Sequence, residues 1–375
     1  MLGVVSLGVP TSAGARERTI VGPDRAETAK LVKSAIVLEP ESGLVLFEKD
    51  SHHQGPPASM TKMMLMLLVA EGVRNGSLHW NDPVRVSERA SKMGGSQVYL
   101  KPGEVFTLGE MMAAIVIHSA NDAAYAVAER VAGSAPDFVN RMNERARELG
   151  LKETQYRSVH GLPPEAGKPA DLSSAHDLSL LAQKLIAFPE ILKWSGTKKT
   201  KFRNDTLILT NTNRLVQEND WIDGLKTGSY GAAGFSVTAT GRRDGMRLIA
   251  VVMGAPDRNT CFAAAEQLLK NAFAEYQMLA PIHEGDVVAN DVAVKRGRPR
   301  FVRVVAGGTL TVLSKRGQSR HFGLELSLPP AIEAPLTARQ VVGQVIVHEG
   351  EHVVGTVPAV AADDVEVGGL WDRVF

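Results

Sequence analysis

The segment from Pro56 to Gly72, PPASMTKMMLMLLVAEG, places Ser59 and Lys62 at the start of an apolar run. Residues three apart lie on one face of a helix, so the hydroxyl and the amine of this pair can touch. Burying an unpaired ammonium costs several kcal/mol, so burial favours the neutral amine. A neutral lysine can take the proton of a serine hydroxyl, and the free N–H groups of a helix start favour developing negative charge. The pair is therefore typical of a nucleophile and its base.

Two later segments carry residue types that suit the same chemistry. IHSANDAAYA contains Ser119 and Asn121 where a helical stretch ends, and DGLKTGSYGAAGFSV contains Lys226 on a predicted strand. Ser119 follows Ser59 by 60 residues, and Lys226 follows Ser119 by 107. The chain thus holds Ser-x-x-Lys, Ser-x-Asn and Lys-Thr-Gly in this order.

These three motifs are the set found in penicillin-binding proteins and class A β-lactamases. The sequence resembles this group from about residue 30 to residue 278. The flanking segments GGSQVYLKPGEVFTLGEMMAAIVIHSANDAA and NRLVQENDWIDGLKTGS are similar to the D-alanyl-D-alanine carboxypeptidase branch of the low-molecular-mass penicillin-binding proteins. A small β domain behind the catalytic unit is also a feature of that branch.

The resemblance implies the catalytic roles. Ser59 would attack the carbonyl between two D-alanines while Lys62 takes its proton. Ser119 and Lys226 would lie across the cleft, where the second cation helps to keep Lys62 neutral and relays a proton to the leaving amine. Asn121 would hydrogen-bond the substrate amide and the lysine. Helix capping would explain Ser119 or Asn121 alone, so these roles depend on the three motifs occurring together.

The resemblance also implies the substrate-binding residues. Backbone N–H groups of Ser59 and Ser229 would form the oxyanion hole. Thr227 would bind the terminal carboxylate, and Arg214 would add charge there because a guanidinium matches a carboxylate. Gly228 would leave room for the substrate backbone to lie along the strand.

The implied function is that of a serine D-Ala-D-Ala carboxypeptidase of the periplasm or cell envelope. It would remove the terminal D-alanine from peptidoglycan pentapeptides during cell-wall maturation, be acylated by β-lactam antibiotics and need no cofactor. The alternatives are a D,D-endopeptidase, a class A-like β-lactamase and a non-catalytic wall-binding protein. A class A β-lactamase uses a loop glutamate, and no Glu-x-x-Leu-Asn occurs between residues 119 and 226. The intact serines and lysines argue against a silent binding protein.

Several other segments suggest chemistry that their context does not support. HEGEH at 348–352 matches the zinc-protease motif, but Gly350 at its centre and β-type flanks favour a hairpin turn, so no metal site is predicted. A second Ser-x-x-Lys, Ser195–Lys198, we interpret as a chance match in an exposed basic loop. KRGRPRFVR at 295–303 suggests an exposed β edge or a contact with anionic cell wall, and a net charge of +1 gives no reason to expect nucleic-acid binding. His160 we interpret as a structural loop residue.

The element pattern predicts an α+β catalytic domain. Residues 34–50 predict a hairpin around Pro40–Gly43, and residues 81 to about 201 are mostly helical by their apolar spacing. From Thr206 the pattern turns to strands, with a turn ending in Asp-Gly at Arg242–Gly245, and a helix follows from Cys261. This order predicts an antiparallel sheet with flanking helices. The only cysteine excludes an internal disulfide.

The ends of the chain differ from this unit. From residue 280 to residue 367 the sequence is valine-rich and punctuated by turns, which predicts a small all-β domain after a catalytic domain at 29–279. Residues 1–28 suggest a residual leader with a cleavage site near Ala13–Ala15. Residues 368–375, GGLWDRVF, predict a short amphipathic tail with weak, reversible contact to the inner membrane.

Overall fold

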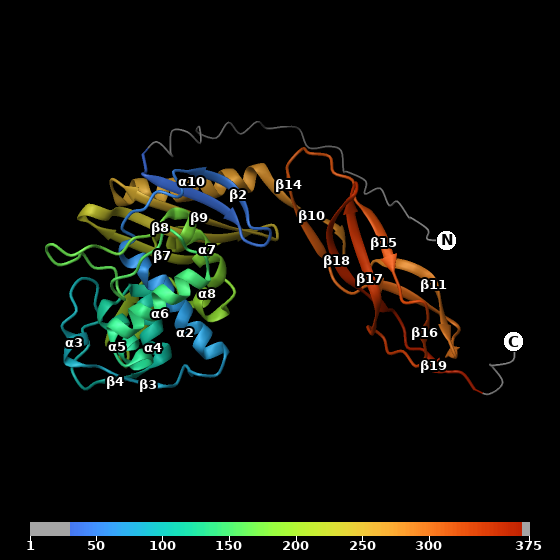
Figure 1. The fold of residues 1–375 in the computed structure, drawn as a ribbon, viewed down its shortest axis with the longest axis horizontal. Coiled ribbons are helices and arrows are strands. Elements are labelled where there is room, and N and C mark those ends of the chain that lie inside the picture. Colours follow the sequence, from blue (N-terminus) through green and yellow to red (C-terminus); the bar gives the residue numbers. More distant parts are fainter. Residues whose placement is uncertain (1–30, 370–375) are drawn as a thin grey trace. The chain divides into compact units, whose positions relative to one another are not determined.

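The computed structural model describes residues 31–369, and Figure 1 shows their arrangement within each unit. The predicted leader and residues 370–375 of the predicted tail lie outside the described residues. The described chain divides between Ala274 and Glu275 into two compact units, which we describe separately. Among the described residues, no helix combines the length and the apolar character needed to cross a membrane.

A five-stranded antiparallel sheet forms the frame of the N-terminal unit (Figure 1). Its strands in spatial order are β2 (Leu44–Lys49), β1 (Ser34–Glu39), β9 (Met246–Ala255), β8 (Gly234–Arg243) and β7 (Ile222–Tyr230). Both predicted hairpins are confirmed: β1 and β2 flank Pro40–Gly43, and β8 and β9 are joined at Asp244 and Gly245. These two turn residues have φ values of 48° and 78°, the left-handed region that Asp-Gly turns favour. The order leaves β7 at the edge, where its outer side can accept another chain.

Helices cover both faces of this sheet. In Figure 1, α10 (Arg258–Glu275) lies above the sheet and the other large helices lie below it. Of these, α7 (Ala175–Leu185) contacts β9 and β1 directly. Other helical elements of this unit are η1 (Ala58–Thr61), α2 (Lys62–Arg74), α3 (Glu88–Ser91), α4 (Leu108–His118), α5 (Asn121–Ala132), α6 (Ala135–Glu148), α8 (Pro189–Ser195) and α9 (Arg214–Glu218). A short η2 (Gly231–Ala233) joins β7 to β8. The predicted antiparallel sheet with flanking helices is confirmed.

Helix α2 lies in the middle of the helical layer and is buried on nearly all sides, which explains its uniformly apolar sequence. Three of the surrounding helices, α4, α6 and α7, begin at side-chain caps. Thr107 and Glu110 form a reciprocal capping box at α4, and Ser134 and Ser174 cap α6 and α7. Local sequence therefore sets where these helices start, and tertiary burial keeps α2 in place.

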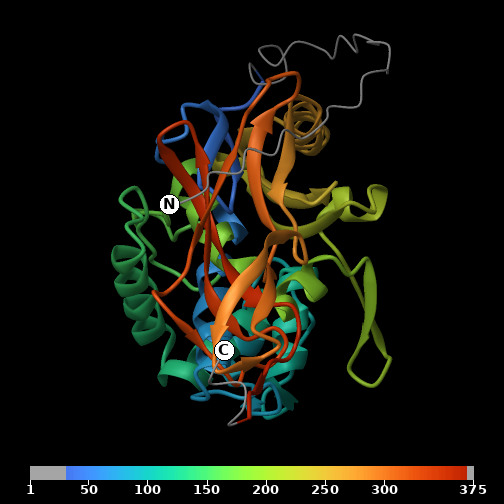
Figure 2. The same ribbon diagram turned by 90° about the vertical axis from the view of Figure 1, so that its right-hand side faces the viewer.

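Two short ribbons accompany the sheet, and one corrects a prediction. β3 (Pro83–Arg85) pairs with β4 (Val105–Thr107), and β5 (Lys199–Phe202) pairs with β6 (Leu207–Thr210). The latter is the lime-green hairpin at the right of Figure 2. The helical prediction to residue 201 was therefore wrong at its end, because the four residues of β5 pair with β6 instead of continuing α8.

Ser195 is also not in an exposed loop, as the sequence had suggested. It is the last residue of α8 and is buried, and its hydroxyl donates to the Asp223 carbonyl at 2.7 Å. Lys198 is exposed and pairs with Asp220, so each residue of this second Ser-x-x-Lys has its own partner. Ser195 is a packing residue that fastens α8 to β7.

The C-terminal unit is all-β, as predicted. Its main sheet has the order β15 (Gly323–Ser327), β17 (Val341–Glu349), β18 (His352–Ala361), β13 (Phe301–Ala306), β11 (Val287–Lys295) and β16 (Ile332–Glu333). Two ribbons pair β10 (Tyr276–Ile282) with β14 (Leu310–Lys315) and β12 (Gly297–Arg298) with β19 (Glu366–Val367). Buried valines such as Val304, Val345 and Val347 fill the core. Residues 348–352 form the β17–β18 turn with Gly350 at φ 59°, which confirms the hairpin interpretation.

Candidate active site

Ser59 and Lys62 meet where η1 passes into α2. The Lys62 Nζ lies 3.0 Å from the Ser59 Oγ and donates to the His160 carbonyl at 2.7 Å. Lys62 is fully buried, and this burial, followed by the charge of Lys226, lowers the pKa of its ammonium well below the usual value. Asp171 and Asp122 oppose that shift only in part. A neutral amine beside the hydroxyl can accept its proton, which is what a serine nucleophile requires.

Ser119 and Lys226 form a second serine–lysine pair. The Lys226 Nζ donates to the Ser119 Oγ at 2.9 Å and to the Thr227 carbonyl at 3.1 Å. Burial lowers the pKa of Lys226 to about 7. Ser119 sits at the C-terminal cap of α4 in the left-handed conformation, with φ 65°, between α4 and α5. The chain therefore turns sharply at Ser119, and its hydroxyl reaches the lysine of β7.

Asn121 begins α5 and lines the same cleft. Its amide nitrogen donates to the Gly94 carbonyl at 2.7 Å, while its Oδ1 is buried and has no hydrogen-bond partner. The predicted bond to a lysine is not formed, because Lys62 and Lys226 are already engaged by other acceptors. A buried acceptor without a donor is costly, so Oδ1 is suited to an N–H from a bound substrate.

These residues line one cleft of about 530 Å³. Its polar lining includes Ser59, Ser119, Asn121, Thr212, Thr227, Ser229, Ser236 and Arg258, and its apolar lining includes Leu162, Phe235 and Phe262. Three predicted binding residues belong to it: Thr227, whose hydroxyl donates to Thr212 at 2.7 Å, Gly228, and the exposed Ser229 on edge strand β7. The structure therefore brings together eight of the nine predicted residues, since Lys62 and Lys226 reach the cleft through the two serines.

Two glycines allow this convergence, and one of them corrects a predicted role. A Cβ on Gly228 would lie 2.4 Å from the Pro57 carbonyl oxygen, so the missing side chain makes room for η1 rather than for the substrate. A Cβ on Gly161 would lie 1.9 Å from the Ala58 carbonyl oxygen, and Gly161 also has φ 75°. Both glycines let another backbone approach the nucleophile-bearing turn.

Arg214 does not line the cleft, contrary to the sequence-based expectation. Its guanidinium donates to Asn259 at 2.8 Å, pairs with Glu218 at 3.1 Å and lies over the ring of Phe262. Arg258, the first residue of α10, lines the cleft instead. The sequence analysis missed Arg258, since nothing in its local sequence distinguishes an arginine at a helix start from an ordinary surface arginine.

His160 is a second residue whose importance the sequence did not reveal. Its backbone carbonyl accepts from Lys62, and its Nδ1 accepts from the Leu162 N–H at 3.1 Å. Burial and the charge of Lys62 lower the pKa of His160 to about 4, so the imidazole is neutral at pH 7. The His160 side chain thus helps to fix the loop conformation in which the His160 carbonyl accepts from Lys62. The signal available in the sequence was the glycine that follows His160, because glycine adopts positive φ without strain.

Two buried carboxylates, those of Asp171 and Asp122, accept hydrogen bonds from loops around the cleft. Asp171 accepts hydrogen bonds from the backbone N–H groups of Arg157 and Ser158, and from the Ser158 hydroxyl. Asp122 accepts from the N–H groups of Val98 and Leu100. Both carboxylates are held by several donors, so they fix loops around the cleft.

Comparison with known proteins places this geometry in a family. Residues 23–257 match the family model of D-alanyl-D-alanine carboxypeptidases, peptidase family S11, and residues 276–367 match the C-terminal domain of penicillin-binding protein 5. The D-alanyl-D-alanine carboxypeptidase DacF of Bacillus subtilis is 35% identical over 374 residues, which covers 99% of this chain and 94% of the relative.

Solved structures of penicillin-binding proteins are similar to this chain in fold. A peptidoglycan synthesis regulatory factor (PBP3) from Streptococcus pneumoniae has a TM-score of 0.74 and 27% identity, with 90% of this chain and 99% of that one covered. Penicillin-binding protein D2 from Listeria monocytogenes, in its ampicillin-bound form, has a TM-score of 0.59 and 31% identity, with 64% and 97% covered.

The buried Lys226 should cost stability. In the unfolded chain a lysine has a pKa of about 10.4, whereas in the folded chain the value is about 7. Between these values only the unfolded state holds the proton, so the free energy of unfolding rises with pH in that window. Lys226→Met should remove this cost, raise the free energy of unfolding at pH 7 by at least about 1 kcal/mol, flatten its rise from pH 7 to 10, and abolish labelling by a fluorescent penicillin.

Thermal melting across this pH range measures both effects, and 1 kcal/mol corresponds to about 2–4 °C for a domain of this size. Lys152→Met, at an exposed position, is the matched control and should change neither the slope nor the labelling. A Lys226→Met protein that melts lower, with the pH slope of the unmodified chain, would contradict the burial argument.

Proposed function

Since the chain belongs to the D-alanyl-D-alanine carboxypeptidase family, peptidase S11, we propose that it hydrolyses the terminal D-Ala-D-Ala bond through an acyl-enzyme on Ser59. Family members are serine-type carboxypeptidases that act on peptidoglycan stem peptides and bind β-lactams. The observation that carries the proposal is the 3.0 Å contact between the Ser59 hydroxyl and the Lys62 amine, whose pKa is lowered by burial. This contact supplies the nucleophile and the base in one turn of chain.

Acylation begins with proton transfer from Ser59 to Lys62 as the oxygen attacks the carbonyl between the two D-alanines. The backbone N–H groups of Ser59 and Ser229 stabilise the oxyanion. As the C–N bond breaks, the released D-alanine nitrogen takes a proton from the Lys62–Ser119–Lys226 network. A pKa of Lys226 of about 7 lets that lysine replace the proton near neutral pH. Water then attacks the ester, and Ser59 is regenerated.

The substrate is held by groups on both sides of the cleft. The unpartnered Oδ1 of Asn121 accepts the N–H of the peptide on the acyl side. The Thr227 hydroxyl and the Arg258 guanidinium bind the terminal carboxylate, since both line the cleft beside the edge strand. Arg214 acts indirectly, because its guanidinium bonds Asn259 and lies over the ring of Phe262, which lines the cleft.

The same geometry separates a carboxypeptidase from a β-lactamase. A β-lactamase requires a carboxylate that activates water for rapid deacylation. Asp171 and Asp122 are the carboxylates whose charges act on Lys62, and backbone donors already occupy both. β-Lactam acyl groups should therefore be released slowly from Ser59.

The nucleophile can be tested with two serine variants. Ser59→Ala should lose both D-alanine release from a pentapeptide and covalent labelling by fluorescent penicillin. Ser195→Ala should keep both, because the buried Ser195 hydroxyl bonds only backbone carbonyls; its loss should cost about 1 kcal/mol of stability. Measuring free D-alanine against cross-linked dimer separates hydrolysis from transfer to a peptide amine. Label that persists in Ser59→Ala would refute the assignment.

The carboxylate-binding arginine can be tested in the same assay. Arg258→Gln should lower kcat/KM for the pentapeptide by about 10- to 100-fold, the effect of losing one charge-assisted hydrogen bond. Arg214→Gln is the matched control and should reduce it less. A pentapeptide with a C-terminal amide should be insensitive to Arg258→Gln. A larger loss in Arg214→Gln would restore the assignment made from the sequence.

We further propose that the protein acts on the periplasmic side of the cell envelope, where its relatives' substrate lies, and that residues 368–375 make weak contact with the inner membrane. The sequence spaces four apolar residues of this tail as on one side of a helix, but only Arg373 is basic, which would add about 1 kcal/mol of attraction to anionic lipid. Co-sedimentation with anionic vesicles should be weak and should fall further when residues 368–375 are deleted. Tight sedimentation that survives the deletion would show that another segment binds lipid.

A further inference from the structure

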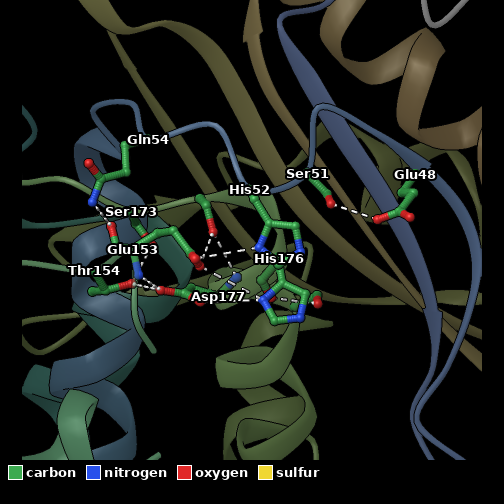
Figure 3. Close-up of polar contacts among 11 residues, drawn as sticks. Glu48, Ser51, His52, Gln54, Glu153, Thr154, Ser173, His176 and Asp177 are labelled. Atoms are coloured by element: carbon green, nitrogen blue, oxygen red, sulfur yellow. Dashed lines mark hydrogen bonds and ion pairs between the residues drawn. The ribbon is translucent and has the colours of Figure 1, made fainter. Parts of the chain in front are cut away.

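A second cluster of chemically capable side chains lies outside the active-site cleft. It consists of His52, Glu153 and His176, shown in Figure 3, and we call it the His-Glu-His cluster. One potential ligand atom from each residue lies within 4.8 Å of the others. The Glu153 carboxylate lies beside the two imidazoles, with its Oε1 3.5 Å from the Nδ1 of His52 and its Oε2 4.0 Å from the Nδ1 of His176. The two rings face each other with centroids 4.2 Å apart.

We propose that the His-Glu-His cluster binds one divalent transition-metal ion, with Zn²⁺ as the best fit. Two imidazoles and one carboxylate form a ligand set that zinc accepts, with a fourth position for water. Ligand atoms about 2.1 Å from a tetrahedral ion lie about 3.4 Å apart, close to the two separations to Glu153. Small side-chain rotations would complete the geometry. His52 is largely exposed, so an ion and its water can enter from solvent.

Backbone hydrogen bonds join the chain segments that carry the cluster. His52 lies on the loop before η1. The N–H of His176, in the first turn of α7, donates to the Ser51 carbonyl, and Gly55 exchanges two hydrogen bonds with Ser173 just before α7. Gln155, two residues after Glu153, likewise exchanges two backbone hydrogen bonds with Leu172. The segments that carry the three ligands are thus held near one another by backbone bonds that do not depend on the ligand side chains. This preorganisation reduces the entropy that an ion must offset on binding.

The glutamate has its own supports. Its backbone N–H donates to the buried Asp177 carboxylate at 2.8 Å, and the Gln54 side chain donates to its carbonyl at 3.0 Å. Ser174, the N-cap of α7, reaches the Glu153 carboxylate at 3.4 Å. Figure 3 shows the Glu153 carboxylate pointing toward His52 and His176. Such outer contacts orient a ligand before the ion arrives.

The position of the cluster indicates what the ion would do. His52 precedes Ser59 by seven residues, and Glu153 precedes His160 by seven residues. Ser59 is the proposed nucleophile, and the His160 carbonyl accepts from Lys62. An ion shared by His52 and Glu153 would therefore fasten together the two loops that bring these groups to Lys62. The ion would stabilise the folded catalytic unit without taking part in the chemistry.

Titration of the untagged, chelator-treated full chain with ZnCl₂ tests this proposal. Calorimetry should show one Zn²⁺ per chain at this site, and saturating Zn²⁺ should raise the melting temperature by about 5 °C. His52→Ala and His176→Ala should each weaken binding by at least about tenfold and remove most of the melting shift. Glu153→Gln should weaken it similarly.

His53→Ala is the matched control, because His53 is the exposed neighbour of His52 on the same loop but does not belong to the cluster. It should bind Zn²⁺ as the unmodified chain does. His52 is exposed, so His52→Ala should fold, and unchanged penicillin labelling verifies this. Absence of Zn²⁺ binding, unchanged binding in both histidine variants, or an equal loss in His53→Ala would overturn the proposal. D-Alanine release at 25 °C should not change on chelation, and a loss that zinc restores would contradict the structural role.

Discussion

Two lysines removed from water determine how the rest of the N-terminal unit is built. Lys62 and Lys226 are both fully buried, and desolvation is the first cause of the lowered pKa of each. A neutral amine at position 62 is what makes Ser59 a nucleophile, so the apolar surroundings of α2 are a catalytic requirement as well as a core. The cost appears in stability, since an ammonium at either position opposes folding near neutral pH. Function and stability conflict at these two side chains.

Two carboxylates, those of Asp122 and Asp171, partly oppose the effect of desolvation on the pKa of Lys62. Asp122 and Asp171 favour the charged form of Lys62, but their lone pairs are shared with backbone N–H groups of the surrounding loops. Each carboxylate therefore stabilises the charged form of Lys62 and also holds a loop in place. The loop held by Asp171 carries His160, whose carbonyl accepts from Lys62. Electrostatics and loop geometry are consequently coupled around one amine.

The main features of the fold could be predicted from the sequence because they rest on local signals. Alternation, the Asp-Gly turn and the apolar spacing of helices predicted the hairpins, the helix from Cys261 and the all-β C-terminal unit. The prediction was wrong where tertiary contacts overrode local pattern. Ser195 lies in a basic segment, yet its hydroxyl is buried against the Asp223 carbonyl of β7. Residues 199–202 could have extended a helix, but pairing with β6 makes them a strand.

The residues of the candidate site also divide into those that the sequence could identify and those that only the folded structure places at the cleft. By itself the sequence determined which residue types are present and in what order, and the three motifs sufficed to indicate a serine nucleophile with two lysines, because each motif is local. Only the tertiary structure decided that Arg258 lines the cleft while Arg214 supports its wall, and that Gly228 makes room for η1. It alone brought His52, Glu153 and His176 together from three distant segments. The physical reason is that side-chain contacts between remote segments depend on packing and backbone direction, which leave no periodic trace in the chain.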